Sequence, residues 1–217
     1  TGRGQLPACD CEGKQLWTRT IVAQGGLPSI MWGYSSSPLM HKGKIYVQVL
    51  QNHNGRRYPY MLGGRSKVDS YLMAVNPADG KTLWAQRRMT DALDESQESY
   101  ATPVPRTTKD GEEILVMGAD YVTGHNAETG KERWRWKGYN PDKSAVYRIV
   151  PSPVACAGLV VICAPKKAPV YAFRPGGKTA WTLGDDCSSD VCTPLVYQGR
   201  LYVLNGLGLL WRPLLLF

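Results

Sequence analysis

Gly80-Lys81-Thr82-Leu83-Trp84 is one of four copies of a Gly-Lys-x-x-Trp pattern in this chain. The other copies run from Gly13 to Trp17, from Gly130 to Trp134 and from Gly177 to Trp181. The four tryptophans are 67, 50 and 47 residues apart. A phrase that recurs at about 40–50 residues is typical of a repeat architecture. The 217-residue chain is therefore predicted to consist of repeated units.

A second marker recurs in the same order along the chain. Each unit has a Ser-Pro or Thr-Pro step in front of an apolar segment, at Pro38, Pro103, Pro153 and Pro194. A turn that contains Gly follows, and then a run rich in Val, Ile, Leu and Tyr, such as Ile45-Tyr46-Val47-Gln48-Val49. Such runs joined by Gly turns predict β-hairpins. Pro is expected at a strand start, because it lacks the N–H that a central strand needs.

The rest of each unit reads as two more strands and a tight turn. Third strands are predicted to end near 72–75, 122–125 and 170–173. The turns Asn76–Gly80 and Asn126–Gly130 contain residues that favour tight turns, and the fourth strand carries the Trp. Helical periodicity is absent from the sequence except for one short turn allowed at 91–99. Four-stranded units of this length predict an all-β fold, a β-propeller of antiparallel blades.

The repeated Trp and Gly residues are expected to have a structural role. An indole buries a large apolar area and donates its N–H to a nearby carbonyl, while Gly allows the positive φ of a tight turn. We interpret these residues as docking each blade on the next: Trp17, Trp84, Trp134 and Trp181, with Gly13, Gly80, Gly130 and Gly177.

The segment Ala74–Trp84 resembles the tryptophan-docking motif of the PQQ-like, quinoprotein-type β-propeller repeat family. That motif has a small residue, Asp or Asn two residues later, then Thr-Gly, and Trp four residues after the Gly. The copy from Gly124 to Trp134 fits well, the next is one residue shorter between Ala172 and Gly177, and the first is looser. The resemblance covers nearly the whole chain, and it implies a propeller that commonly has eight blades.

At about 47 residues per blade, the chain provides about three complete blades and parts of others. The predicted units are 1–17 (partial), 18–84, 85–134, 135–181 and 182–217 (truncated). We therefore expect an open arc of a larger propeller. The chain has no initiating Met and its last twelve residues lack the turn motif, so we expect a fragment. Residues 206–217 are interpreted as an edge strand or a cloned or frameshifted end, too short to span a membrane.

The resemblance implies a cofactor only for some members of the family. Quinoprotein dehydrogenases bind pyrroloquinoline quinone over the central channel, with calcium held by acidic and amide side chains, an Asp base and a disulfide between adjacent cysteines. This chain has no adjacent cysteines. Asp185, Asp186 and Asp190 are the nearest approach to a cation site, and we interpret them as a solvated turn. We expect no cofactor and no metal; quinone with calcium belongs to the alternative of a dehydrogenase fragment.

Charge and cysteine content limit the partners and the compartment. The net charge of +8 is spread over turns and strand faces, with small clusters at 56–57, 87–88 and 166–167, and is interpreted as solvated surface. No nucleic-acid-binding motif is present, so we expect no nucleic-acid partner. Cys187 and Cys192 are a candidate disulfide, which would indicate an oxidising compartment.

Loops on one face are where a repeat protein is expected to bind. The insert from Gln51 to Asp69 is longer than an ordinary connection and contains Arg57 among several aromatic and basic residues. A second group precedes the Ser/Thr-Pro steps and would line one mouth of the channel if the first strand of each blade is innermost. The candidate binding residues are Trp32, Tyr34, Arg57, Tyr100, Arg148 and Asp190.

We predict a non-catalytic module that binds a protein or a small ligand at the propeller face, or acts as a scaffold. It looks like the non-catalytic relatives, such as the propeller lipoprotein of the outer-membrane barrel-assembly machine. That resemblance implies an extracytoplasmic bacterial location. The first alternative is a fragment of a quinone-dependent alcohol or sugar dehydrogenase. The second is a sensor propeller attached to a kinase.

Overall fold

A computed structural model describes residues 2–21, 28–53, 69–166, 168–184 and 187–205, and the backbone of 208–213. A short 3-10 helix, η2 (Asp94–Gln97), lies inside the 91–99 segment. Within the described residues, no helix has both the length and the apolar character needed to cross a membrane. The named strands of this part of the chain pair in antiparallel sheets.

Three sheets have four strands each, and the all-β fold prediction is confirmed. The first of them contains β3 (Leu39–His41), β4 (Lys44–Val49), β5 (Tyr71–Val75) and β6 (Thr82–Arg87). The next contains β7 (Val104–Thr108), β8 (Gly111–Gly118), β9 (Tyr121–Asn126) and β10 (Glu132–Lys137). The last contains β11 (Val154–Cys156), β12 (Leu159–Cys163), β13 (Val170–Phe173) and β14 (Thr179–Leu183).

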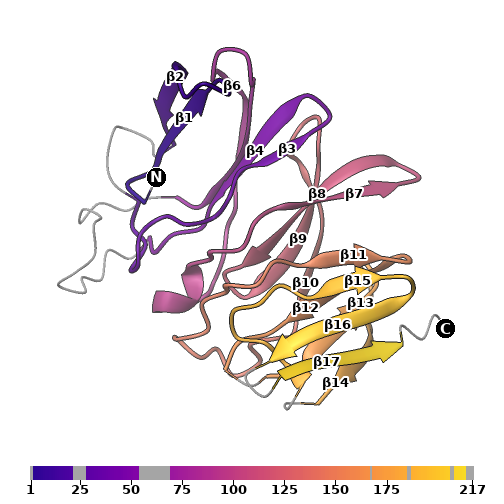
Figure 1. The fold of residues 1–217 in the computed structure, drawn as a ribbon. Helices are drawn as coiled ribbons and strands as arrows, with labels where there is room; N and C mark the ends of the chain where they lie inside the picture. Colours follow the sequence, from indigo (N-terminus) through magenta and orange to yellow (C-terminus); the bar gives the residue numbers. More distant parts are fainter. Residues whose placement is uncertain are drawn as a thin grey trace.

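Smaller sheets lie at the two ends of this series. β1 (Gln5–Cys9) pairs with β2 (Gln15–Thr20), and β15 (Leu195–Tyr197), β16 (Arg200–Asn205) and β17 (Gly208–Pro213) form a three-stranded sheet. Figure 1 shows the sheets following one another around an open arc in the order of the chain. Each Ser/Thr-Pro step stands directly before the first strand of its sheet, at β3, β7, β11 and β15.

The strand register repeats from sheet to sheet. A small residue lies opposite each docking Trp: Ala8 opposite Trp17, Ala74 opposite Trp84, Gly124 opposite Trp134 and Ala172 opposite Trp181. A register shift follows next to each pair. A Cβ added at Gly124 would overlap the Trp134 indole, so at this position only a residue without a side chain lets the ring lie across the sheet as it does.

The core consists of apolar layers between successive sheets. Val47 and Val49 of β4 pack in the layer shared with the β1–β2 sheet. Tyr46 on the same strand packs on the other side, with Ile114 and Val116 of β8. Because the inner strands are covered on both faces, they read as nearly continuous apolar runs, and all five residues of β12 are buried. Between the β7–β10 sheet and the β11–β14 sheet, Trp136 stacks on Phe173, with ring centroids 4.1 Å apart.

Trp17 and Trp84 contact the turn of the next sheet in the same way. The Trp17 Nε1–H donates to the carbonyl of Pro77 at 2.8 Å, and the ring lies against Gly80. The Trp84 Nε1–H donates to the carbonyl of Ala127 at 3.2 Å, and its ring lies against Gly130. Gly80 and Gly130 have φ of 72° and 74°.

The turn between β13 and β14, at residues 174–177, differs from the prediction for Gly177. Here Gly176, with φ of 68°, is the positive-φ glycine beside Trp134, because the turn is one residue shorter and closes with Gly177 N–H donating to the Arg174 carbonyl. The Trp134 Nε1–H accordingly donates to Glu113 Oε2 of its own sheet, at 3.2 Å. The Trp134 ring still meets the next sheet through Phe173, edge to face at 6.2 Å.

The remaining docking residues lie at the ends of the arc. Trp181 packs against the layer formed with Leu201 and Val203, and its buried Nε1–H has no hydrogen-bond acceptor among the described residues. Gly13 has φ of 84°, and the space beside it is open in the described part of the chain.

The interpretation of the basic pairs as solvated surface is wrong for Arg88. Its side chain is only 2% exposed, at the end of β6. The guanidinium donates to Thr123 Oγ1 and to the carbonyls of Gly118 and Tyr121, each at 3.0 Å. Burial lowers the pKa of Arg88 to about 10, so the group remains charged at neutral pH and holds the β8–β9 turn against the preceding sheet.

Candidate functional site

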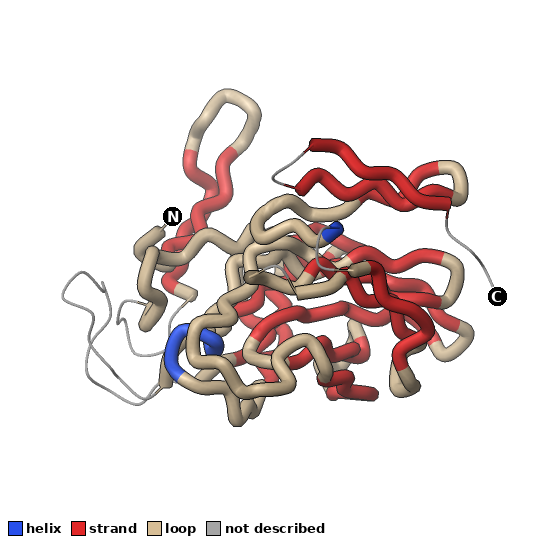
Figure 2. The backbone as a smooth tube through the Cα atoms, turned by 90° about the horizontal axis from the view of Figure 1, so that it is seen from below, coloured by secondary structure: helices blue, strands red, loops and turns tan. Residues whose placement is uncertain are grey.

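The segments that precede the first strands meet on one face of the arc. β7 contacts β11, and β11 contacts β15, so the first strands lie on the inner side as expected. Ser99, before β7, forms a parallel bridge with Ile149, before β11, and Tyr100 N–H donates to the Ile149 carbonyl at 2.7 Å. Figure 2 shows loops, drawn in tan, gathered beside the strands.

A hollow of about 280 Å³ opens among these segments. We call it the Trp32 hollow; its lining residues are Trp32, Ser35, Tyr100, Arg148 and Val150. Three of them, Trp32, Tyr100 and Arg148, are candidate binding residues from the sequence, and they come from three successive loops. The Trp32 side chain is 64% exposed, so it presents an aromatic surface to solvent.

A buried carboxylate holds the Trp32 loop in place. Glu98 is fully buried, and its Oε2 accepts hydrogen bonds from Met31 N–H at 2.9 Å and from the Tyr100 hydroxyl at 3.0 Å. The Tyr100 oxygen in turn accepts the Trp32 N–H at 3.3 Å. Both hydrogen-bonding directions of the Tyr100 hydroxyl are therefore used, and Tyr100 presents its ring to the hollow.

Burial determines the proton affinities in this network. It raises the pKa of Glu98 to about 7, against the hydrogen bonds from Met31 and Tyr100, which favour the ionised form. It also raises the pKa of Tyr100 well above its ordinary value, and the nearby Glu98 charge adds to that shift. Tyr100 is therefore a neutral hydrogen-bond donor at any physiological pH, whereas Glu98 can change its charge near neutrality.

Arg148 is fixed from behind by a second acidic residue. Its Nη1 donates to Oε1 of the buried Glu95 at 2.6 Å, and the Arg148 side chain is 28% exposed. Glu95 is in η2, and η2 is anchored because Ser96 Oγ donates to the Ser144 carbonyl and accepts the Tyr147 N–H. The guanidinium is thus oriented by the structure while part of it remains accessible.

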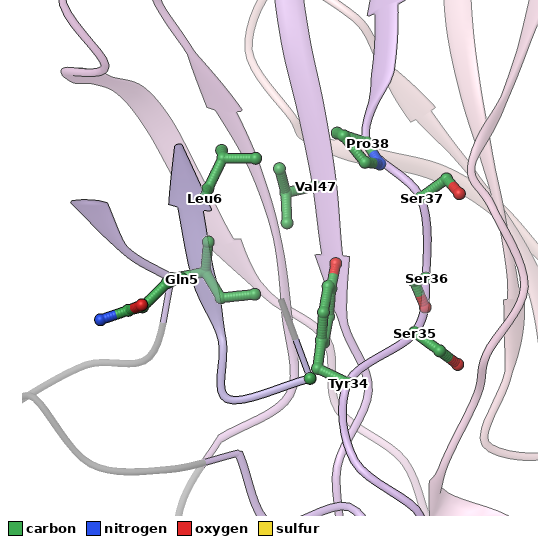
Figure 3. Close-up of a pocket in the computed structure, with 10 residues that line it drawn as sticks. Gln5, Leu6, Tyr34, Ser35, Ser36, Ser37, Pro38 and Val47 are labelled. Carbon is green, nitrogen blue, oxygen red and sulfur yellow. The ribbon is translucent and has the colours of Figure 1, made fainter. Parts of the chain in front are cut away.

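Tyr34 does not line the Trp32 hollow. It lies in a separate cavity of about 210 Å³ between β1 and the 35–38 segment, where Figure 3 shows it between Leu6 and the serines. Its hydroxyl donates to the Gln48 carbonyl at 2.9 Å, and its N–H donates to the Gly2 carbonyl at 3.0 Å. Burial strongly raises the pKa of Tyr34. Tyr34 therefore connects the segment before β1 with β4.

Asp190 and Arg57 are not part of the hollow either. Asp190 is exposed, and its Oδ1 accepts the Lys166 N–H at 3.0 Å, which ties the loop before β15 to the end of β12. Arg57, together with most of the 51–69 insert, lies outside the described residues, as do Asp185 and Asp186.

The cysteine prediction is not realised in this structure. Cys187 and Cys192 are both free, as are the other four cysteines. Cys187 packs against the apolar layer that contains Cys163, and Cys192 N–H donates to Ser189 Oγ at 2.8 Å. Pairing of Cys187 with Cys192 under oxidising conditions remains a prediction.

Metal ligands do not gather in the described residues. No three His, Cys, Asp or Glu side chains of this part of the chain are grouped so that they would hold a metal ion. Near the Trp32 hollow Glu95 is paired with Arg148, and Oε2 of Glu98 accepts hydrogen bonds from Met31 and Tyr100, whereas the buried Glu98 Oε1 has no partner among the described residues.

Sequence reasoning missed the supporting residues of the hollow. Glu95 and Glu98 are not among the candidate residues from the sequence, because a polar run such as 94–99 reads as solvated loop. Residues 95–99 are buried, and Ser99 pairs with Ile149, 50 residues later in the chain. The available signal was the position of this run, directly before the candidate Tyr100.

Comparisons with known proteins identify similar chains. The profile of a protein family described as "Outer membrane protein assembly factor BamB" matches residues 1–182. The quinohemoprotein alcohol dehydrogenase ADH-IIG of Pseudomonas putida is 29% identical over 180 residues, which is 79% of this chain and 20% of that protein.

Solved structures share the fold over a longer part of the chain. BamB from Moraxella catarrhalis matches 98% of this chain and 52% of its own, with a TM-score of 0.61 and 15% identity. Quinohemoprotein alcohol dehydrogenase from Comamonas testosteroni matches 93% of this chain and 41% of its own, with a TM-score of 0.60 and 12% identity. The chain thus spans about half the length of the first structure and a fifth of the curated relative.

Proposed function

The chain belongs to the PQQ-like β-propeller repeat family, that of the outer membrane protein assembly factor BamB, and from this we propose that it is a non-catalytic binding or scaffold module. The proposed binding site is the Trp32 hollow. The observation that carries the proposal is that three successive blades each contribute a candidate binding residue to one fixed site.

The state of the acidic groups supports binding over catalysis. A general base has to reach its substrate, whereas Glu98 is fully buried behind Tyr100. Glu95 is buried and paired with Arg148. What the hollow offers to a partner is an indole face, a phenol ring and a guanidinium. These are the side chains that are enriched in protein-binding hot spots.

We place the module outside the cytoplasm of a bacterium. The family description, which names an outer membrane protein assembly factor, supports this location. The proposed partner is a protein or a small ligand at the propeller face, and no nucleic acid. The whole propeller is proposed to have more blades than the sheets described here, eight if the common number of the family applies.

A quinone titration tests the proposal. The protein is mixed with pyrroloquinoline quinone and calcium, and the quinone absorbance and dye-linked alcohol oxidation are measured. We expect neither binding nor activity, because Glu95 is paired with Arg148 and Glu98 is buried behind Tyr100. Quinone binding with dehydrogenase activity would overturn the scaffold proposal. Trp32→Ala is the companion variant, because loss of quinone binding in it would locate that cofactor in the hollow.

A dehydrogenase fragment is the second candidate. The similarity to the quinohemoprotein alcohol dehydrogenase of Pseudomonas putida favours it, since that relative is an enzyme by name. The chain matches only 20% of that protein, so groups elsewhere would have to supply the catalytic site. The same titration, made on a longer form of the protein, distinguishes the two candidates.

A further inference from the structure

The hydrogen-bond donors at the Trp32 hollow are unequally used. The Tyr100 hydroxyl is occupied in both directions by Glu98 and Trp32 N–H. Arg148 has one described partner, Glu95, which takes Nη1 alone. A guanidinium has five N–H donors. Among the described residues no partner takes the Nη2 and Nε donors of Arg148, so these are left to solvent or to a bound ligand. The Ser35 hydroxyl, on an exposed residue, adds another donor at the same wall.

The charge of the lining has one sign. Arg148 is the charged residue among the five that line the hollow, and the two carboxylates of the network are buried behind it. Arginine binds carboxylates with paired, charge-assisted hydrogen bonds. The net charge of +8 would also steer an acidic partner toward the protein. Because Arg148 is paired with Glu95, the preference for an acidic ligand comes from the remaining N–H donors of the guanidinium.

The rest of the wall is apolar. The indole of Trp32, the ring of Tyr100 and the side chain of Val150 surround the Arg148 edge. Sites for drug-sized ligands usually enclose about 300–1,000 Å³. At about 280 Å³ the hollow suits one or two side chains of a partner better than a whole cofactor.

We infer that the Trp32 hollow takes an acidic segment of a partner protein, with a carboxylate on Arg148 and a neighbouring apolar or aromatic side chain against Trp32 and Tyr100. This inference rests on the proposed binding function and names the chemistry of its partner. Glu95 and Glu98 act as positioning residues. Glu95 orients the guanidinium, and Glu98 holds the Trp32 loop through Met31 and Tyr100.

A peptide titration followed by NMR tests this inference. The probe is the acetylated, amidated pentapeptide Gly-Asp-Phe-Asp-Gly. Its matched controls replace both Asp by Asn, both Asp by Lys, or Phe by Ala. The readout is the indole Nε1–H resonance of Trp32, which is assigned with Trp32→Phe. We expect saturable binding of the acidic aromatic peptide, with affinity lower by about 10- to 100-fold for the Asn peptide.

Two variants connect the binding to the hollow. Arg148→Met keeps most of the apolar stem and removes the charge, and it should weaken the acidic peptide by about 10- to 100-fold while leaving the Asn peptide unchanged. Arg87→Met is the charge-matched control, because Arg87 is exposed and pairs with Asp69. It should leave both affinities as they are.

Three outcomes would contradict the inference. Equal binding of the Asp and Asn peptides, or an unchanged affinity in Arg148→Met, would show that Arg148 does not select a carboxylate. Preference for the Lys peptide would show the opposite charge selectivity. Absence of binding by every peptide would overturn the named partner chemistry. None of these results involves quinone or dye reduction, so failure here is distinct from failure of the scaffold proposal.

Discussion

At the scale of single residues, four copies of one tryptophan have three different hydrogen-bonding environments. Trp17 and Trp84 donate to a carbonyl in the next sheet. Trp134 donates to Glu113 in its own sheet, and Trp181 has no acceptor among the described residues. The apolar contact is therefore the common part of the motif, and the hydrogen bond depends on the neighbouring turn.

A pair of Trp→Phe variants measures that hydrogen bond. Trp17→Phe loses both indole area and the bond to Pro77, whereas Trp181→Phe loses area and no described bond. We expect Trp17→Phe to lower the free energy of unfolding by about 1 kcal/mol more than Trp181→Phe. Urea unfolding followed by circular dichroism measures both. Equal losses would mean that the Pro77 bond contributes nothing net.

The raised pKa of Glu98 predicts that the free energy of unfolding depends on pH. Its folded-state pKa of about 7 is above the ordinary 4.5, so the folded protein retains this proton at pH values where the unfolded chain has lost it. The contribution is fully present below about pH 4.5 and is lost as the pH rises through about 7. The full change is on the order of 3 kcal/mol.

Glu98→Gln is the variant that tests this dependence. The amide cannot ionise, so the fall in unfolding free energy between pH 5 and pH 8 should be smaller in the variant. Urea midpoints at the two pH values give the comparison. An identical pH dependence in both proteins would assign the effect to other groups.

At the scale of elements, the tight turn before each fourth strand is a contact surface as well as a connection. Gly130 combines a φ of 74° with a Trp84 ring that an added Cβ would meet at 2.5 Å. The turn at residues 174–177 is one residue shorter. There Gly176 has the positive φ, and Trp134 donates its hydrogen bond to Glu113 of its own sheet. A deletion inside one turn thus changes the docking of the adjacent sheet.

Three Gly→Ala variants separate backbone strain from steric overlap. Gly184 has an ordinary φ and open space, Gly199 has φ of 69° and open space, and Gly130 has both positive φ and the Trp84 ring. We expect Gly184→Ala to be nearly neutral and Gly199→Ala to cost about 1 kcal/mol. Gly130→Ala should cost more than either, because the indole must move. Thermal unfolding ranks the three, and a Gly130→Ala cost equal to that of Gly199→Ala would mean that the ring adapts freely.

At the scale of the whole molecule, stability depends on how many neighbours a sheet has. The β7–β10 sheet has apolar layers on both faces, one with the preceding sheet and one with the following sheet. The β1–β2 pair has one such layer, to which it contributes Leu6 and Trp17. In a repeat array each unit is stabilised mainly by its nearest neighbours.

Hydrogen exchange should follow this order. We expect the amides of β8, where six consecutive residues are buried, to exchange slowest, and those of β1 and β2 to exchange orders of magnitude faster. Mass spectrometry of peptides from a timed exchange series measures the gradient. Uniform protection along the arc would indicate that the sheets unfold as one unit.

The fold was accessible from the sequence because its signals are local and repeated. The Ser/Thr-Pro steps stand before β3, β7, β11 and β15, and the Trp-bearing segments form β2, β6, β10 and β14. The helix η2 also lies within residues 91–99, where the sequence allows one short helical turn. The Gly177 prediction was wrong because a shortened turn changes which residue takes positive φ.

The sequence by itself determined the repeat, the strand order and the residues that face neighbouring sheets, because each of these depends on contacts within one unit or with the next unit, and these contacts recur along the chain. Only the tertiary structure decided which loop residues meet. It brought Trp32, Tyr100 and Arg148 to one hollow, separated Tyr34 and Asp190 from it, and buried Glu98 and Arg88. The physical reason is that a polar side chain is buried or exposed according to partners on the next blade, which no local pattern records.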